Sequence, residues 1–345
     1  MKKTNHTVVF DNATNLHNYV EKESVDLIVT SPPYPMIKMW DALFCQQNPR
    51  IEECLKNNLA VQAYTLMHEE LNKIWAKCYV ALKQGGIMCV NIGDAVRAID
   101  KQFALYPNHS ETIQSLLNLH FNILPCILWH KQTNAPNKFM GSGMTPTNAY
   151  VTLEHEYILV ARKGNKRTFK TQEEKANRLE SAFFWEERNK WFSDLWVDIK
   201  GAPQKIKGNS KTRSGAYPLE LAYRLINMYS VKGDVVLDPF LGTGTTSLAA
   251  AVSTRNSIGI EKNTDLLSVV LDKISTGDLT KKSEFYKQRR LRDHALFAAK
   301  TNRQLKHVNK PYKTSVLTSQ EVNIAFDVVE KVLNKNNNAF EVSYF

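Results

Sequence analysis

Short apolar runs alternate with amphipathic stretches along most of the chain. Strands are predicted at the short, mainly apolar runs 7–10, 25–30, 87–92, 123–129, 157–160, 235–237 and 257–260. Helices are predicted where apolar positions recur every three or four residues, at 16–20, 64–82, 110–119, 219–229 and 245–252. Repeated alternation of strands with helices predicts an α/β fold, with a mostly parallel sheet and helices on both faces.

Two regions depart from this alternation. Residues 164–213 are rich in Lys, Arg, Asn, Glu and Trp and show little periodicity, so we expect an irregular inserted region. Residues 271–345 form a basic, mostly helical extension, in which 322–333 is predicted to be a helix packed on the domain or on a second subunit. The remaining segments, 1–163 and 214–270, are predicted to form one α/β domain.

The composition indicates a globular protein with a polyanionic partner. Hydrophobic residues make up 43% of the chain, and the formal net charge is +11. Excess Lys and Arg suit a partner whose phosphates they neutralise. The five scattered cysteines form no CxxC pair, so no metal site is predicted. We find no apolar segment of membrane-spanning length and no signal-peptide pattern, and therefore expect a cytoplasmic protein.

A glycine-rich turn follows the strand predicted at 235–237. The segment 238–246 reads DPFLGTGTT, and Gly242 and Gly244 let the backbone approach a ligand before a helix begins. Glu261 ends the next strand, where an acid accepts ribose hydroxyls in dinucleotide folds. Asp238 suits a ligand with an ammonium group better than a phosphate. The pattern lacks the third glycine of a dinucleotide site and the lysine of a phosphate loop, and it indicates a nucleoside with a zwitterionic tail.

A second segment, Ser31-Pro32-Pro33-Tyr34, follows the strand predicted at 25–30. Consecutive prolines hold the backbone extended and leave carbonyl groups facing outward. A hydroxyl, a rigid carbonyl and an aromatic face at the carboxyl edge of a sheet form a site for a flat molecule with an amino group. A structural turn with a packing tyrosine is the alternative interpretation.

Together these two segments resemble the amino-methyltransferases of restriction–modification systems. The order, with the catalytic segment before the cofactor segment, is similar to the permuted beta-type class of the N4-cytosine/N6-adenine DNA methyltransferases. Further similar segments are LKQGG at 82–86, ILWHK at 127–131, EHEYILV at 154–160 and YPLEL at 217–221. The resemblance extends over residues 7 to 265 and implies a Rossmann-like S-adenosylmethionine-dependent methyltransferase fold.

The resemblance also implies roles for individual residues. Tyr34 is expected to stack on a base flipped out of the duplex, while Ser31 and the Pro32 carbonyl accept hydrogen bonds from its amino group. No covalent intermediate is expected. The cofactor-binding residues implied by the resemblance are Asp11, Asp238, Pro239, Phe240, Gly242, Thr243, Gly244, Thr245 and Glu261, with 214–221 closing over the methionine end. Ser at position 31 favours cytosine N4 over adenine N6, because Ser accompanies cytosine more often in this family.

The partner implied is double-stranded DNA. Residues 164–213 lie where the family carries its target-recognition region, and 134–147 form a loop suited to closing on DNA. Candidate phosphate or base contacts are Lys131, Arg162, Lys163, Lys166, Arg167, Lys170, Arg178, Lys205, Lys207, Lys211 and Arg213. The basic stretch 281–313 either clamps the DNA backbone or is a solvated helical surface.

Several alternatives stay open. An adenine-N6 methyltransferase is the rival within the same class, and a catalytically silent DNA-binding subunit is the rival from another class. A homodimer is compatible with the sequence, as is a cognate restriction endonuclease that acts on the same site without stable binding.

Overall fold

A ten-stranded sheet forms the centre of the protein in the computed structural model, which describes residues 2–131, 140–201, 217–275, 278–336 and 338–345. The order across the sheet is β10 (Leu195–Trp196), β6 (Phe121–His130), β9 (His155–Lys163), β3 (Leu82–Ile92), β2 (Val25–Thr30), β11 (Val235–Asp238), β12 (Asn256–Glu261), β1 (Lys2–Phe10), β16 (Ala339–Tyr344) and β15 (Val329–Asn336). The five strands from β3 to β1 are mutually parallel, whereas β9 and β16 run antiparallel to their neighbours. The predicted mostly parallel α/β sheet is confirmed.

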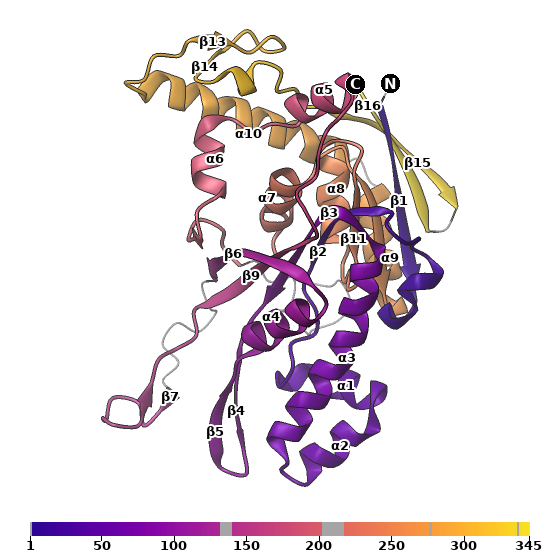
Figure 1. Cartoon of the computed structure of the whole chain (residues 1–345), viewed down its shortest axis with the longest axis vertical. Helices are drawn as coiled ribbons and strands as arrows, with labels where there is room; N and C mark the ends of the chain where they lie inside the picture. The colour runs from indigo at the N-terminus through magenta and orange to yellow at the C-terminus, as the bar shows by residue number, and fades with distance from the viewer. Residues whose placement is uncertain (1, 132–139, 202–216, 276–277, 337) are drawn as a thin grey trace.

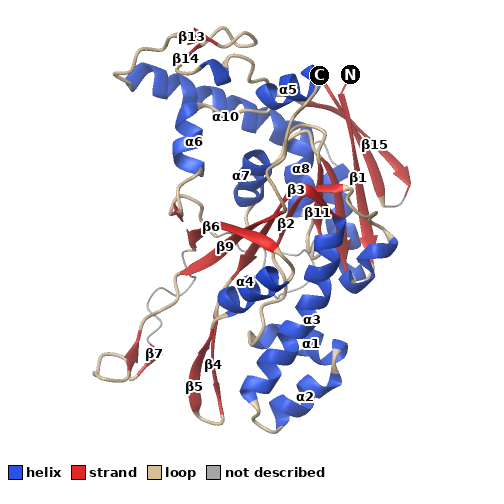
Figure 2. Cartoon of the chain, in the orientation of Figure 1, coloured by secondary structure: helices blue, strands red, loops and turns tan. Residues whose placement is uncertain are grey.

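Helices cover both faces of this sheet (Figure 2). They are α1 (Asp41–Gln47), α2 (Pro49–Lys56), α3 (Ala60–Ala81), α4 (Asn108–Asn118), α5 (Gln172–Glu180), α6 (Trp185–Trp191), α7 (Leu219–Tyr229), α8 (Thr245–Val252), α9 (Leu267–Ser275) and α10 (Asp278–Lys300). In β2, Leu27 and Val29 pack in the core cluster that contains α7 and α8, while Ile28 packs in the cluster that contains α3. Side chains of a strand point alternately to its two faces, so a strand covered on both faces reads as a continuous apolar run.

The two ends of the sheet carry different structures (Figure 1). The N-terminus lies at the top of the view, so β1 and the strands parallel to it run downward. Below their carboxyl ends lie α1, α2, the hairpin of β4 (Ala95–Ile99) with β5 (Gln102–Tyr106), and the hairpin of β7 (Met140–Gly141) with β8 (Ala149–Tyr150). Above their amino ends lie α5, α6, α10 and the small hairpin of β13 (His307–Val308) with β14 (Ser315–Val316).

The region predicted to be irregular contains two helices. In α5, a capping box joins Thr171 to Glu174, but none of its residues is buried, so the helix shows no apolar stripe to detect. In α6, Glu187 is buried and forms an ion pair with Arg290 of α10 at 2.5 Å. Helix α6 therefore packs against the C-terminal segment, whereas β10 pairs with β6 at the edge of the main sheet.

The C-terminal segment is only partly helical. The prediction of a helix at 322–333 is wrong, because this stretch includes part of β15, which pairs with β16 to extend the main sheet beyond β1. The pairing joins residues far apart in sequence, such as Lys2 with Tyr344, and a local periodicity carries no information about it. Several basic side chains of α10 form ion pairs with other parts of the protein; Arg289, for example, pairs with Glu220 at 2.7 Å.

Candidate active site

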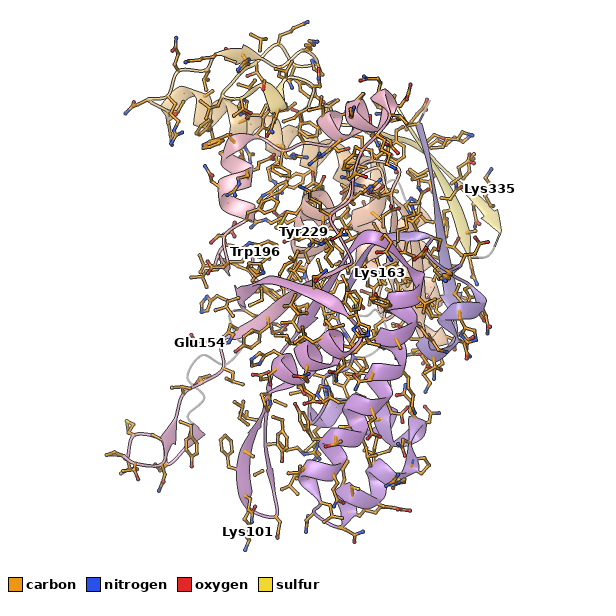
Figure 3. The ribbon with its side chains drawn as sticks, viewed as in Figure 1. Lys101, Glu154, Lys163, Trp196, Tyr229 and Lys335 are labelled. Carbon is orange, nitrogen blue, oxygen red and sulfur yellow. The ribbon has the colours of Figure 1, made fainter. Side chains whose placement is uncertain are left out.

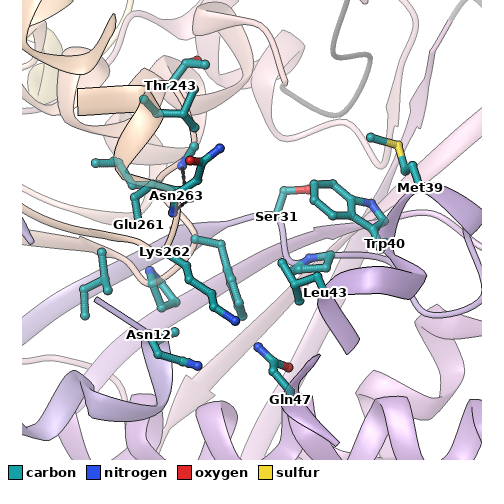
Figure 4. A pocket seen from close by; sticks show the side chains of 18 of the residues that line it. Asn12, Ser31, Met39, Trp40, Leu43, Gln47, Thr243, Glu261, Lys262 and Asn263 are labelled. Atoms are coloured by element: carbon teal, nitrogen blue, oxygen red, sulfur yellow. Dashed lines mark hydrogen bonds between the residues drawn. The ribbon is translucent and has the colours of Figure 1, made fainter. Parts of the chain in front are cut away.

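A single cavity brings the two predicted segments together (Figure 4). It has a volume of about 570 Å³ and lies at the carboxyl ends of β2, β11 and β12. Predicted site residues that line it are Ser31, Pro33, Pro239, Phe240, Gly242, Thr243, Thr245 and Glu261. Pro32, Tyr34, Asp11, Asp238 and Gly244 are not among the lining residues. The segment near the N-terminus and the glycine-rich turn therefore face the same space although about two hundred residues separate them.

Asp238 joins the two segments at the back of this cavity. Its buried carboxylate accepts hydrogen bonds from the Thr30 hydroxyl at 2.7 Å and from the Phe240 backbone N–H at 3.0 Å. Tyr217 and Thr246 donate to its other oxygen. Burial raises the pKa of Asp238, and the hydrogen bonds from these hydroxyls oppose that shift. Thr30 immediately precedes Ser31, so this carboxylate fixes the Ser31–Tyr34 segment to the start of the glycine-rich turn.

The glycine-rich turn is closed by Glu261. Gly242 has φ 56°, and its N–H donates to Glu261 Oε2 at 2.7 Å, while the Asn263 N–H donates to Oε1 at 2.7 Å. Gly244 has φ 82° and is the N-cap of α8, a left-handed conformation that favours glycine. The turn and the acid at the end of the neighbouring strand are thus one hydrogen-bonded unit beside the cavity.

The opposite wall of the cavity comes from residues that the sequence analysis missed. Trp40, Leu43 and Gln47 belong to η2 (Lys38–Trp40) and α1, and Figure 4 shows them facing Lys262 and Asn12 across the cavity. The Lys262 ammonium donates to the Gln46 side chain at 2.9 Å, which links β12 to α1. Aromatic and aliphatic groups on this wall suit a flat heterocycle.

A polar network holds Tyr34 beside Ser31. The Tyr34 hydroxyl donates to Glu156 Oε2 at 3.0 Å and lies 3.0 Å from Ser31 Oγ. Asn91 Nδ2 donates to the Tyr34 hydroxyl at 2.9 Å and to the same Glu156 oxygen at 2.7 Å. The ammonium of Lys131 contacts Glu156 Oε1 at 2.7 Å. Burial and the negative charge of Glu156 raise the pKa of Tyr34 well above its usual range, so its hydroxyl stays protonated.

Comparison with known proteins decides the family. The DNA methylase family of N6 and N4 methyltransferases matches residues 25–272. The chain belongs to this family. It is 48% identical to the type II methyltransferase M.MthZI of Methanothermobacter thermautotrophicus over 99% of this chain and 96% of that protein. It is 47% identical to the type II methyltransferase M.MjaI of Methanocaldococcus jannaschii over 79% of this chain and 91% of that protein.

A similar protein has been solved with its cofactor bound. The putative DNA modification methylase TTHA0409 of Thermus thermophilus, complexed with S-adenosyl-L-methionine, superposes with a TM-score of 0.62 at 28% identity, over 81% of this chain and 94% of that one. The chain is thus an S-adenosylmethionine-dependent DNA amino-methyltransferase of the restriction–modification type. Its cavity volume is within the range of about 300–1,000 Å³ found for small-ligand pockets. The carboxylate of Glu261 and the apolar wall fit the two ends of a nucleoside.

The predicted DNA contacts of this methyltransferase lie in different places. Lys131 is at the carboxyl edge, in the network of Tyr34. Arg167 forms an ion pair with Asp234 at 2.7 Å at the amino end of β11, the opposite end of the sheet, and Lys166 is exposed beside it. Lys163 is buried and donates to the Tyr79 and Leu82 carbonyls, so it is not a surface residue (Figure 3). Lys205, Lys207, Lys211 and Arg213 lie outside the described residues.

Asp11 lies beside the cavity. Its carboxylate accepts from the Tyr19 hydroxyl at 2.7 Å and from the Asn12 N–H at 2.6 Å, and these bonds lower its pKa. Its neighbour Asn12 lines the cavity. Within the described ranges, His, Cys, Asp and Glu form no cluster of three that could hold a metal ion. No described helix has the length and hydropathy needed to cross a membrane.

Proposed function

We propose that this methyltransferase methylates the exocyclic N4 of a cytosine flipped out of duplex DNA, as the modification half of a restriction–modification system. The observation that carries the proposal is the shared cavity, in which Ser31 and Pro33 face the cofactor turn. When bound, S-adenosylmethionine supplies an electrophilic methyl group on sulfur. The residues proposed to hold it are Glu261 at the ribose, the backbone from Phe240 to Gly244 at the methionine end, and Trp40 and Leu43 at the adenine.

The protein's own contribution is orientation. Tyr34 provides the aromatic face on which the flipped base stacks, and the Ser31 hydroxyl and Pro32 carbonyl accept the two amino hydrogens. Holding the amine in this way directs its lone pair toward the cofactor turn, so proximity and alignment account for the rate enhancement. Asp238 is a positioning residue in this scheme, because its described partners are Thr30, Tyr217, Thr246 and Phe240.

The duplex is proposed to approach the carboxyl edge of the sheet. The β4–β5 hairpin extends beyond this edge and carries Lys101 at its tip (Figure 3). Arg97 of β4 makes two hydrogen bonds of 2.8 Å to Asp41, the first residue of α1, so the hairpin is fixed to the wall of the cavity. Helices α5 and α6 of the 164–213 region lie toward the amino edge, whereas β10 pairs with the carboxyl-terminal end of β6. We assign base reading to the β4–β5 hairpin and to the segment between β6 and β9.

Nucleoside mass spectrometry tests the base assignment. Plasmid DNA from a methylation-deficient host that expresses the protein should contain N4-methylcytosine. N6-methyladenine in its place would establish the adenine alternative, since both bases present an amino group on an amidine. The absence of both modified bases, together with no S-adenosylmethionine binding by calorimetry, would indicate a silent DNA-binding subunit. Sequencing the same DNA with modification detection gives the recognition site, which a cognate endonuclease would share.

A further inference from the structure

A chain of hydrogen bonds runs from Ser31 through Tyr34 to Glu156. The Ser31 and Tyr34 oxygens are 3.0 Å apart, and the Tyr34 oxygen is 3.0 Å from Glu156 Oε2. Ser31 lines the cavity, whereas the Glu156 side chain is only 12% exposed and belongs to β9. Among the described residues, the two hydroxyl groups link this carboxylate to the cavity.

The chemistry of the groups fixes the direction of this chain. A carboxylate only accepts hydrogen bonds, so the single proton of the Tyr34 hydroxyl points to Glu156. Asn91 Nδ2 donates to the Tyr34 oxygen from another side. Since Tyr34 has no second proton, the Ser31 hydroxyl must donate to Tyr34 rather than accept from it. The lone pairs of Ser31 then remain for a donor in the cavity.

We propose that Glu156 is a positioning residue that orients the Ser31 hydroxyl, through Tyr34, as an acceptor for the amino group of the target base. The inference rests on the proposed role of Ser31 and deepens it. A serine hydroxyl is by itself ambivalent, because it can donate or accept. Hydroxyl orientation matters here because a proton pointing at the amine would compete for the lone pair that must attack the methyl group.

Lys131 holds the carboxylate in the required orientation. Its ammonium contacts Glu156 Oε1 at 2.7 Å, which leaves Oε2 for Tyr34 and Asn91. The two oxygens of Glu156 therefore have separate partners. The ion pair keeps the carboxylate charged, so that the oxygen facing Tyr34 only accepts hydrogen bonds. Lys131 was predicted to contact DNA, and this geometry gives it a role inside the site.

The isosteric variant Glu156→Gln tests the inference. The amide oxygen of Gln is expected to turn toward the Lys131 ammonium, which places the amide NH2 group against Asn91 and Tyr34. The hydrogen bonds between this side chain, Tyr34 and Ser31 would then run in the opposite direction. We expect the single-turnover methylation rate on duplex DNA to fall about 10²-fold, the order seen when one positioned hydrogen-bonding group is removed from a charged transition state. The dissociation constants for S-adenosylmethionine and for DNA should change less than about threefold, since Glu156 does not line the cavity.

A double-mutant cycle with Ser31→Ala separates orientation of Ser31 from support of the fold. In the Ser31→Ala background, Glu156→Gln should cost no more than about twofold further, because no hydroxyl remains to orient. Tyr34→Phe keeps the aromatic ring but removes the hydroxyl that links Ser31 to Glu156. This variant should lose about as much rate as Glu156→Gln, and combining the two substitutions should cause no further loss. Circular dichroism and the melting temperature check that every variant is folded.

The inference is overturned if Glu156→Gln lowers the rate by the same factor with and without Ser31, since Glu156 would then act independently of the hydroxyl. It is also overturned if the single variant retains the wild-type rate. In both cases the wild-type enzyme still methylates DNA. A wild-type protein that binds S-adenosylmethionine but modifies no base would instead overturn the proposed function itself.

Discussion

Replacing Thr30 by Val removes the hydrogen bond that joins the Ser31–Tyr34 segment to the glycine-rich turn. Thr30 is 1% exposed, and its hydroxyl donates to the buried Asp238 carboxylate at 2.7 Å. Val has nearly the same shape, so the change deletes a donor without leaving a cavity. Asp238 Oδ1 retains only the Phe240 N–H among its described donors.

The expected cost follows from the charge and burial of the acceptor. A hydrogen bond to a charged group contributes about 1.5–3 kcal/mol. At about 2.1 cal/mol/K per residue, a chain of 345 residues unfolds with an entropy near 0.7 kcal/mol/K, so the melting temperature should fall by about 2–4 °C. The bond also aligns Ser31 with the turn, and we expect kcat/KM to fall about tenfold.

Differential scanning calorimetry and steady-state methylation of duplex DNA measure the two effects. Thr112→Val is the matched control, because Thr112 is equally buried but its hydroxyl has no hydrogen-bond partner among the described residues. This control removes a buried hydroxyl that has no described partner, so it should not lower the melting temperature and should leave kcat/KM unchanged. If both variants shift the melting temperature equally, or if Thr30→Val keeps full activity, the proposed role of this junction is refuted.

Three further changes test other parts of the structure. A Cβ at Gly93 would lie 3.1 Å from the Tyr34 ring, so Gly93→Ala should lower kcat about tenfold with unchanged cofactor affinity by calorimetry; unchanged kcat would contradict the packing argument. Lys101→Ala should weaken duplex binding in fluorescence anisotropy and reduce its salt dependence by about one ion, whereas Lys166→Ala at the other end of the sheet should not; the reverse result would place the DNA at the amino edge. Burial lowers the pKa of His6 to about 3, whereas the usual pKa of histidine is about 6.5, so below pH 6.5 the unfolded protein binds a proton on His6 that the folded protein does not bind. The free energy of unfolding, measured by urea titration, should therefore fall by about 2 kcal/mol between pH 6.5 and 5, and His6→Gln should reduce this pH dependence.

The local parts of the fold could be predicted from the sequence. Helices at 219–229 and 245–252 match α7 and α8 residue for residue, because each combines a clear beginning with strong apolar content. Ser31 follows β2, Asp238 is the last residue of β11, and parallel strands end at one edge, so their meeting was predictable. The α1 wall was missed because its seven residues are too few to show a period.

Features that depend on pairing between distant strands were not predictable. Glu156 lies in a segment recognised from the sequence, but its position beside Tyr34 follows from the antiparallel register of β9 with β3, in which Asn91 pairs with Ile158. Arg167 carries a charge that suits DNA, and only the structure shows that Asp234 engages it. Charge identifies a class of partner without giving the location of the contact.

The position of β1 has a consequence for how the protein matures in the cell. This strand is made before both of its partners, because it pairs on one side with residues 256–261 and on the other with residues 339–344. During translation the backbone groups on both edges of β1 therefore stay unpaired until these later residues have been made, and exposed strand edges can pair with other chains. The yield of active enzyme should accordingly depend on chaperone capacity and growth temperature more than on the stability of the finished sheet.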